Sequence, residues 1–393
     1  MFNFKYYSPT KVIFGKNAEE QVGELTRSYG ATKVLVHYGS GSVVRSGLLA
    51  RVKASLDDVG ISHVELGGVV PNPHLSKVRE GIVLGKSEGV DFILGVGGGS
   101  VIDSAKAISY GLAEPESDVW ELFEKKRRAK AFLPVGCVLT IAAAGSETSR
   151  GSVITNVDTG EKRAYDDDIS RPKFAMMNPE LTMTLPDYQT QAGCADIMMH
   201  TMERYFTQGG NMEITDEIAE GLLRTVMKYA EVLHRDPTNY EARAEIMWAG
   251  SLAHNGLTGC GGSGGDWVTH MIEHELGGMF DVTHGAGLAA LWPSWARYVY
   301  RDCLPRFVRY AVKVMGVMPQ AGDEETARKG IEAVESFYHR IGMPTNMREL
   351  GIELTEEQIR QMAASWARAT GGGQGAARRL NEQDVVEIYR MAR

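Results

Sequence analysis

Asp91-Phe-Ile-Leu-Gly-Val-Gly-Gly-Gly-Ser100-Val-Ile-Asp103-Ser-Ala-Lys-Ala107 joins a short apolar run to three consecutive glycines and the beginning of a helical pattern. Glycines let a backbone approach a diphosphate without clashes from Cβ atoms. The first turn of the following helix offers unpaired N–H groups and the positive end of the helix dipole. The segment therefore predicts a buried strand, a phosphate-binding turn and a helix.

This glycine turn is an imperfect dinucleotide fingerprint, because Ser100 stands where a third glycine is expected. Taken alone, it fits a tight strand-to-helix turn without a ligand equally well. A second turn of similar type exists, since Lys33-Val-Leu-Val-His37 precedes Tyr38-Gly-Ser-Gly-Ser42 and a predicted helix through Leu56. Two such turns after parallel strands favour a site that holds both ends of one dinucleotide.

The second turn also bears on the choice of cofactor. In dinucleotide sites an Asp or Glu near the adenosine ribose binds the ribose hydroxyls and repels a 2′-phosphate. No acidic residue occurs between Val34 and Val44, and Arg45 follows. Either Arg45 is an ordinary solvated helix residue, or it provides the charge for that phosphate while the small turn residues leave room. We expect NADP(H), with NAD(H) as the alternative, in contact with Gly39, Ser40 and Ser42.

Asp196-Ile-Met-Met-His200 and His270-Met-Ile-Glu-His274 each place two metal-type donors four residues apart. Residues 192–206 and 266–277 both have helical patterns, so each pair projects from one helix face, and His284 follows the second. For any single histidine, a buried or solvated imidazole without a metal is the better interpretation. The repeated helical spacing leaves that interpretation and a metal centre both open.

One carboxylate with several imidazoles suits Fe²⁺, Zn²⁺, Mn²⁺, Co²⁺ or Ni²⁺, and the sequence does not choose among them. Structural zinc sites usually use cysteine, and no paired spacing occurs among Cys137, Cys194, Cys260 and Cys303. A catalytic metal with an open position is therefore the preferred interpretation. The helix of the second pair is expected to have Asp266 as its N-cap and to end at Gly277-Gly278.

The chain of 393 residues, 43% of them hydrophobic, is long enough for two domains. Residues 1–180 alternate apolar runs with helical patterns, which predicts an α/β dinucleotide-binding domain with a Rossmann-like parallel sheet. Residues 181–393 have the pattern of long amphipathic helices, which predicts an all-helical domain that carries the metal donors. Metal and nucleotide are then expected to meet between the domains. The expected strands are Lys11–Phe14, Lys33–His37, Ser62–Leu66, Phe92–Val96 and Phe132–Val135.

Charge and hydropathy argue against several classes of protein. The formal net charge of −8 argues against nucleic-acid binding, and the run Lys125-Lys-Arg-Arg128 is typical of a solvated helix end. No apolar stretch is long enough to span a bilayer, and the amino terminus has no secretory signal pattern. Scattered cysteines suit a reducing compartment. We therefore expect a cytoplasmic protein that binds neither nucleic acid nor a membrane.

Several motifs, in order along almost the whole chain, resemble those of the iron-containing, or group III, alcohol dehydrogenase family. Within the family they are most similar to the butanol dehydrogenase-like, NADPH-dependent aldehyde reductases. The motifs are the Tyr6–Gly15 segment, Gly97-Gly-Gly-Ser-Val-Ile-Asp103, Ala144-Gly-Ser-Glu147, Asp196-Ile-Met-Met-His200, Gly265-Asp-Trp-Val-Thr-His270-Met-Ile-Glu-His274 and Asp281-Val-Thr-His284-Gly-Ala-Gly-Leu288.

The resemblance implies a two-domain architecture of the dehydroquinate synthase type, a homodimer, and hydride transfer between NAD(P)H and short-chain aldehydes or primary alcohols. It implies one divalent metal, Fe²⁺ or Zn²⁺, with the ligands Asp196, His200, His270 and His284. His274 matches a histidine that lies beside the metal without binding it. The cofactor residues that it implies are Gly97, Gly98, Gly99, Ser100, Asp103, Thr140, Ser149 and Lys162.

Two stretches depart from the family's pattern. Tyr38-Gly-Ser-Gly-Ser42 stands where this branch usually has Gly-Gly-Gly-Ser, and Ile141-Ala-Ala-Ala144 has fewer hydroxyl groups than some members. These departures weaken individual cofactor contacts, whereas the set of metal ligands is complete.

In the implied reaction the metal polarises the carbonyl oxygen while hydride arrives from nicotinamide C4. A proton must still be exchanged with solvent, and His274 is the candidate for that transfer. A packing or supporting role for His274 is an equal alternative.

Other enzyme classes share parts of this pattern. A dehydroquinate synthase-like lyase would use the same layout while retaining its NAD and its metal. A serine hydrolase is suggested by Gly261-Gly-Ser263-Gly-Gly265 followed by Asp281 and His284, but no β-branched strand precedes Ser263. A phosphate-transferring NTPase is weaker still, because Glu80 stands where Gly85-Lys-Ser87 would need an upstream glycine.

Overall fold

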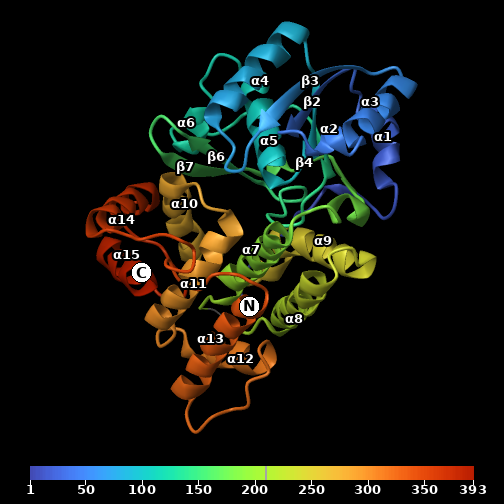
Figure 1. The fold of residues 1–393 in the computed structure, drawn as a ribbon. Helices are drawn as coiled ribbons and strands as arrows, with labels where there is room; N and C mark the ends of the chain where they lie inside the picture. The colour runs from blue at the N-terminus through green and yellow to red at the C-terminus, as the bar shows by residue number, and fades with distance from the viewer. Residues whose placement is uncertain (209) are drawn as a thin grey trace. The chain divides into compact units, whose positions relative to one another are not determined.

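Six parallel strands form one sheet in the N-terminal half of the chain (Figure 1). The strands are β1 (Lys11–Phe14), β2 (Lys33–Gly39), β3 (Ser62–Val69), β4 (Phe92–Gly97), β5 (Val135–Leu139) and β8 (Phe174–Met177). Their order along the sheet is β1-β8-β5-β4-β2-β3, and every neighbouring pair is parallel. The structure is a computed structural model that describes residues 1–208 and 210–393.

Helices cover both faces of this sheet. On one face, Ile93 of β4 belongs to the same buried cluster as residues of α4 (Leu75–Glu88) and α5 (Gly99–Ala113). On the other face, Phe92 and Leu94 cluster with residues of α1 (Val22–Ser28) and α3 (Leu48–Asp58). A central strand that is buried on both faces has a continuous apolar sequence, as β4 does. The predicted Rossmann-like parallel sheet is therefore confirmed.

The strands of the α/β half differ from the sequence prediction in their bounds and in their number. Strands β2, β3 and β4 end at Gly39, Val69 and Gly97, beyond their predicted ends at His37, Leu66 and Val96. The strand expected at 132–135 begins only at Val135, because Pro134 has no N–H to donate to a neighbouring strand. Strand β8 and an antiparallel hairpin are absent from the prediction. The hairpin consists of β6 (Gly151–Asn156) and β7 (Glu161–Asp166).

The helix expected to run from the β2 turn through Leu56 is interrupted. A short helix, α2 (Ser42–Arg45), ends before Gly47, and α3 begins at the next residue. The φ angle of Gly47 is +73°, a left-handed conformation that ends a helix and that glycine adopts without steric cost.

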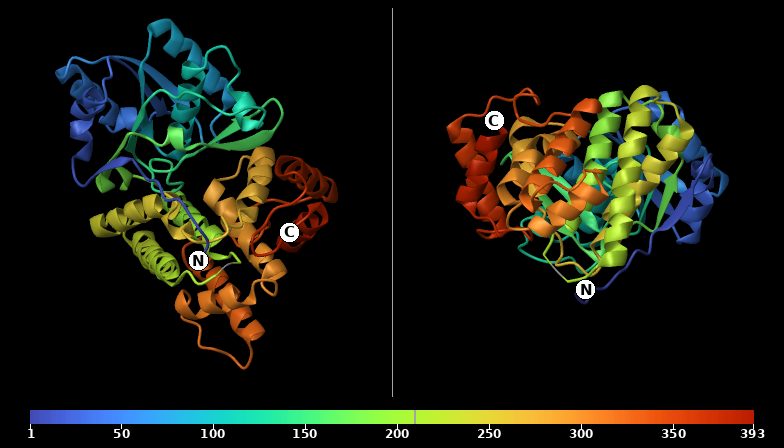
Figure 2. Two further views of the ribbon diagram at one scale, coloured as in Figure 1. Left: turned by 180° about the vertical axis from the view of Figure 1, so that it is seen from behind. Right: turned by 90° about the horizontal axis from the view of Figure 1, so that it is seen from below.

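The chain divides into two compact units, Tyr7–Thr184 and Leu185–Arg393, and Met1–Tyr6 belongs to the second. The N–H of Phe2 donates to the carbonyl of Gly261 at 2.9 Å, which attaches the amino terminus to this unit. The described residues from 185 onward form helices and no strand, so the predicted all-helical region is confirmed (Figure 2). The longer helices are α7 (Asp187–Tyr205), α8 (Glu213–Arg235), α9 (Tyr240–His254), α10 (Val268–Phe280), α11 (His284–Val299), α12 (Leu304–Lys313), α13 (Asp323–Arg340), α14 (Glu356–Thr370) and α15 (Glu382–Ala392).

Helix α10 differs from its prediction at both ends. Asp266 is not its N-cap, because Trp267 lies between them in a left-handed conformation with a φ of +63°. The helix also continues past Gly277-Gly278 and ends at Phe280, before the left-handed Asp281. Glycine inside a helix costs only about 1 kcal/mol, which the packing of a buried helix offsets.

Among the described residues, no helix combines the length and the apolar character that crossing a membrane requires.

Candidate metal centre and cofactor-binding loops

Three of the four predicted metal ligands converge in the helical unit. Oδ1 of Asp196 on α7 lies 3.6 Å from Nε2 of His270 on α10 and 3.8 Å from Nε2 of His284 on α11. All three donor atoms lie within 4.8 Å of one another. The side chain of His284 is 26% exposed, whereas those of Asp196 and His270 are buried. The group is therefore least buried at His284.

A glycine allows the close approach of α11 to α7 that brings these donors together. Gly285 directly follows His284, and a Cβ atom at this position would lie 1.9 Å from the carbonyl oxygen of Ala192 on α7. Any other residue would therefore push the beginning of α11 away from α7 and His284 away from Asp196.

The donor set fits a divalent cation. Within the described part of the chain, Oδ1 of Asp196 and Nε2 of His270 are buried and have no hydrogen-bond partner. Their separation of 3.6 Å is too long for a hydrogen bond, and Nε2 of His284 lies within 4.8 Å of both atoms. Burial alone would raise the pKa of Asp196, but His200 and His284 hold it well below its usual range. A buried carboxylate that stays ionised beside imidazoles suits the binding of a divalent cation.

The fourth predicted ligand, His200, is close by, but its ring nitrogens are outside this group of three donors. Its Nδ1 lies 3.0 Å from the carbonyl oxygen of Asp196 and 3.1 Å from Oδ1 of the same residue. The centre of its ring is 4.5 Å from that of His270. Burial lowers the pKa of His200 to about 4, so the ring is neutral near pH 7, as a metal ligand must be.

His274 lies one turn after His270 on α10 and is buried. It forms a second group of close donor atoms with Glu273 and His284. The centre of its ring is 5.9 Å from that of His284. The residue predicted to lie beside the metal group is thus adjacent to one of its donors.

Two glutamates contact the donor histidines and are missing from the sequence prediction. Glu203 on α7 lies 3.1 Å from Nδ1 of His270, and Glu273 on α10 contacts Nδ1 of His284. Spacing contains a partial signal for them, because Glu203 follows Asp196 by two helical turns and Glu273 directly precedes His274. His254 is a further imidazole that the sequence does not single out, with its ring centre 3.9 Å from that of His200.

The turn between β4 and α5 requires its glycines for close packing within the protein. A Cβ at Gly97 would lie 2.5 Å from Val101, one at Gly98 would lie 2.9 Å from Ile141, and one at Gly99 would lie 3.0 Å from Ala144. Gly98 precedes α5 and has no side chain to cap it, while Ser100 is in the first helical turn. An uncapped helix N-terminus beside a tight glycine turn suits a diphosphate.

Other predicted cofactor residues take part in a polar network inside the α/β unit. Both carboxylate oxygens of Asp103 accept internal hydrogen bonds, one from the Ser146 hydroxyl and one from the N–H of Val153 at 2.9 Å. The carbonyl of Ser149 accepts a bond of 3.0 Å from the buried Lys106. The N–H of Thr140 donates to the carbonyl of Gly97, and Lys162 is buried on β7. The bond to Gly97 places Thr140 beside the glycine turn.

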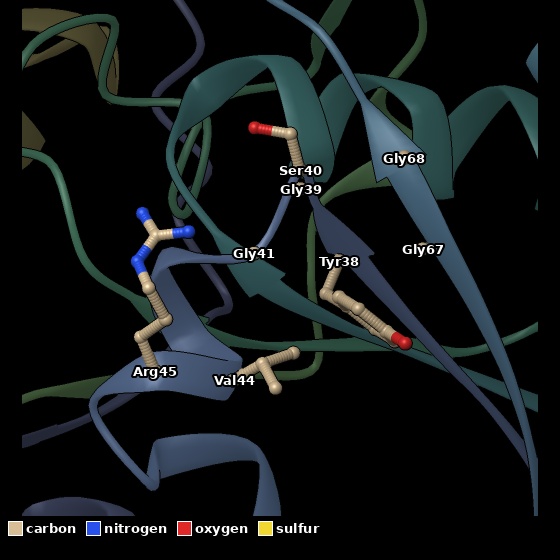
Figure 3. A pocket seen from close by; sticks show the side chains of 8 residues that line it. All are labelled: Tyr38, Gly39, Ser40, Gly41, Val44, Arg45, Gly67 and Gly68. Carbon is tan, nitrogen blue, oxygen red and sulfur yellow. The ribbon is translucent and has the colours of Figure 1, made fainter.

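A pocket of about 550 Å³ lies at the end of β2 (Figure 3). Its wall consists of the β2 turn, the last two residues of α2 and two glycines of β3. Ser42 is at the start of α2, next to the lining residue Gly41. The Arg45 guanidinium lies over the turn, because a Cβ at Gly41 would be 3.1 Å from it. None of the lining residues is acidic; they are Tyr38, Gly39, Ser40, Gly41, Val44, Arg45, Gly67 and Gly68.

Comparisons with known proteins agree with this arrangement. The iron-containing alcohol dehydrogenase family matches residues 9–179, and the C-terminal part of the Fe-containing alcohol dehydrogenase family matches residues 190–393. NADH-dependent butanol dehydrogenase A of Clostridium acetobutylicum is 40% identical, with 99% of each chain covered. NADPH-dependent aldehyde reductase YqhD of Escherichia coli is 35% identical, with 90% of each chain covered.

A solved structure gives the same result. The crystal structure of NADH-dependent butanol dehydrogenase A from Thermotoga maritima has a TM-score of 0.96 and 41% identity, covering 100% of this chain and 99% of its own. With two family matches in sequence order, relatives of high identity over nearly full length and a common fold, the chain belongs to the iron-containing alcohol dehydrogenase family.

Proposed function

We propose that this protein is a metal-dependent aldehyde reductase, or alcohol dehydrogenase, that prefers NADPH and acts on short-chain aldehydes or primary alcohols. The observation that carries the proposal is the convergence of Asp196, His270 and His284 from three helices. Membership of the family makes the chain an NAD(P)-dependent oxidoreductase, and a dehydroquinate synthase-like lyase is not favoured. A serine hydrolase is not supported either, because a short helix, η4 (Leu257–Gly259), and not a strand precedes Ser263.

The metal in this proposal is Fe²⁺ or Zn²⁺, held by the three converging donors and by His200 as the fourth ligand. When bound, it supplies a Lewis acid toward a carbonyl oxygen. The chain contributes a buried negative charge at Asp196 and a neutral imidazole at His200. A proton competes with the metal for His270, because burial lowers the pKa of this residue but Asp196 and Glu203 outweigh that effect and raise it to about 9. Metal binding must therefore release a proton.

The cofactor residues in this proposal are those of the two turns and the network around them: Gly39, Ser40, Ser42, Gly97, Gly98, Gly99, Ser100, Asp103, Thr140, Ser149 and Lys162. The preference for NADPH is supported by Arg45 and by the lack of an acidic residue in the wall of the pocket. The names of the relatives include both NADH and NADPH enzymes. We expect a lower KM for NADPH than for NADH with the same aldehyde, and a preference for NADH would contradict this part of the proposal.

His274 is our candidate for moving the proton between product and solvent, because it is adjacent to His284 without being one of the proposed ligands. We predict that His274→Phe lowers turnover and changes the pH profile while the metal content stays near that of the wild type. An unchanged pH profile would favour a packing role. A homodimer and a cytoplasmic location remain predictions of the proposal.

The test of the proposed reaction combines metal analysis with NADPH oxidation. We expect the purified protein to contain a divalent metal and to oxidise NADPH stoichiometrically with butyraldehyde. Chelation, or Asp196→Ala, should lower kcat/KM by about a hundredfold or more, because Lewis-acid catalysis contributes several kcal/mol.

Asp187→Asn is the matched control for this experiment. Asp187 is on the same helix as Asp196, but its side chain is 44% exposed and pairs with His234 at 2.8 Å. Its replacement should leave metal content and activity unchanged. Undiminished turnover of butyraldehyde after complete removal of the metal would overturn the proposed function.

A further inference from the structure

Two buried carboxylates outside the proposed ligand set face the outer nitrogens of the donor histidines. Oε1 of Glu203 lies 3.1 Å from Nδ1 of His270 and also accepts the backbone N–H of His270 at 3.0 Å. Oε2 of Glu273 contacts Nδ1 of His284. The side chains of Glu203 and Glu273 are 1% and 0% exposed, so both carboxylates are removed from water.

These contacts select one tautomer of each ring. An ionised carboxylate can only accept hydrogen bonds, so Nδ1 of the facing imidazole must carry the proton. In the neutral ring that binds a metal, the lone pair is then on Nε2, which is the nitrogen nearest Asp196 in both histidines. Nδ1 of His200 is also occupied, by the carbonyl oxygen of Asp196 at 3.0 Å. All three rings are thus held by Nδ1, which leaves Nε2 for a cation.

The two glutamates also connect the three ligand helices. Helix α7 carries Asp196 and the glutamate that orients His270 on α10, while α10 carries the glutamate that orients His284 on α11. Helix α11 has a glycine, Gly287, at the point where the side chain of Glu273 packs against it. A Cβ at Gly287 would be 3.0 Å from Cγ of Glu273, so this glycine leaves the space that the carboxylate occupies.

We infer that Glu203 and Glu273 are positioning residues that hold His270 and His284 in the tautomer and orientation that bind the metal, and that they set how tightly the metal is retained. The inference rests on the proposed metal site. Hydrogen bonds of this kind raise the basicity of the ligand, and their loss typically lowers metal affinity about 10- to 100-fold.

The test is a competition for Zn²⁺ between the metal-free protein and a chromophoric chelator. Glu203→Leu and Glu273→Leu remove the acceptor oxygen and should each weaken Zn²⁺ binding about 10- to 100-fold. Glu203→Gln and Glu273→Gln retain an acceptor oxygen and lose the charge, so their affinities should fall between those of the leucine variants and the wild type. Circular dichroism checks that each variant is folded, and the glutamine variants decide the result if a leucine variant is not.

Glu220→Gln is the matched control. Glu220 is another glutamate of the helical unit with a fully buried side chain, and it accepts hydrogen bonds from the Tyr205 hydroxyl at 2.8 Å and from Arg309 Nε at 2.5 Å. Its replacement should lower stability but leave the Zn²⁺ affinity at the wild-type value. If Glu220→Gln loses as much Zn²⁺ affinity as Glu203→Gln and Glu273→Gln do, the effect comes from general destabilisation and the inference is overturned.

Asp196→Ala separates failure of the inference from failure of the proposed function. If wild type and Asp196→Ala bind Zn²⁺ equally, or neither binds it, the metal site itself is wrong and the inference fails with it. If Asp196→Ala loses Zn²⁺ while all four glutamate variants bind it as the wild type does, the metal site stands and the positioning role is wrong.

Discussion

His37 is a fully buried imidazole on β2 that connects two neighbouring elements. Its Nδ1 lies 2.9 Å from the carbonyl oxygen of Leu66, and its Nε2 lies 2.8 Å from the hydroxyl of Ser104. Burial lowers the pKa of His37 from 6.5 to about 4. The ring is therefore neutral in the folded protein, whereas it takes up a proton in the unfolded chain below about pH 6.5. Its contribution to stability is present above pH 6.5 and is lost as the pH falls toward 4.

We predict that, between pH 7 and pH 5, the wild-type chain loses about 2 kcal/mol more free energy of unfolding than His37→Gln does. The measurement is urea unfolding at both pH values, followed by circular dichroism. His37→Gln should be less stable at pH 7 but should respond less to acid. His63→Gln is the control, because His63 pairs with the exposed Asp57 at 3.2 Å, and it should keep the wild-type response. Equal acid sensitivity of the wild type and His37→Gln would contradict the prediction.

Among single residues, the sequence predicts the proposed metal donors better than it predicts the glutamates that contact them. The spacing of four residues places Asp196 on a helix face, and the structure brings it to His270 and His284. Spacing does not set the rotation of a ring, which explains why His200 is adjacent to the group without joining it. A glutamate on a helix is usually solvated, so no pattern distinguishes Glu203 before the packing of three helices is known.

Lys106 on α5 is a buried ammonium group that fastens the segment between β5 and β6. Its Nζ donates to the carbonyl oxygens of Ser146, Ser149 and Gly151 at 2.8, 3.0 and 2.8 Å. Burial lowers the pKa of Lys106 to about 8. Since Ala144 of the same segment lies against Gly99, this clamp also fixes the surroundings of the proposed diphosphate turn.

We predict that Lys106→Met destabilises the α/β unit by about 3 kcal/mol, because carbonyl groups that Lys106 satisfies lose their donor in a buried site. Denaturant unfolding measures this loss. The KM for NADPH should rise more than kcat falls, because the clamp acts on the binding turn and not on reacting atoms. Lys53→Met is the control, since this partly exposed lysine pairs with Glu65 near the surface and its loss should cost less than about 1 kcal/mol. If Lys106→Met is as stable as the wild type, the hydrogen bonds of Lys106 do not stabilise this segment and the prediction is wrong.

For whole elements, hydrophobic periodicity predicts the main strands and helices but not their ends. Strand β8 has only four residues and no β-branched side chain, and it becomes a strand because β1 and β5 pair with it on both sides. The start of α10 is set by Trp267, whose ring lies under the Arg204 guanidinium at 4.5 Å and donates to the carbonyl of Gly264 at 2.8 Å. Such tertiary contacts have no signature in a local sequence pattern.

For the whole molecule, the sequence predicts the fold class of each half because the two halves have different patterns of hydrophobic residues. Alternating apolar runs and helical patterns predict a parallel sheet with covered faces, and sustained amphipathic patterns predict helices packed on helices. The proposed metal donors are all in the helical unit, and the two glycine turns proposed to bind the cofactor, after β2 and β4, are both in the α/β unit. Each ligand should therefore stabilise its own unit first, since a ligand that binds only the folded form shifts the unfolding equilibrium.

Tryptophan fluorescence separates these effects, because five of the six tryptophans, all except Trp120, are in the helical unit. We predict that Zn²⁺ at about 100 times its Kd raises the unfolding temperature of the metal-free helical unit by about 5 to 10 °C, which corresponds to about 2.7 kcal/mol. Asp196→Ala should abolish the shift, whereas Asp187→Asn should retain it. NADPH without metal should leave the fluorescence transition nearly unchanged. An equal Zn²⁺ shift in Asp196→Ala would mean that the stabilising ion binds elsewhere, and the three converging donors would then lose their assigned role.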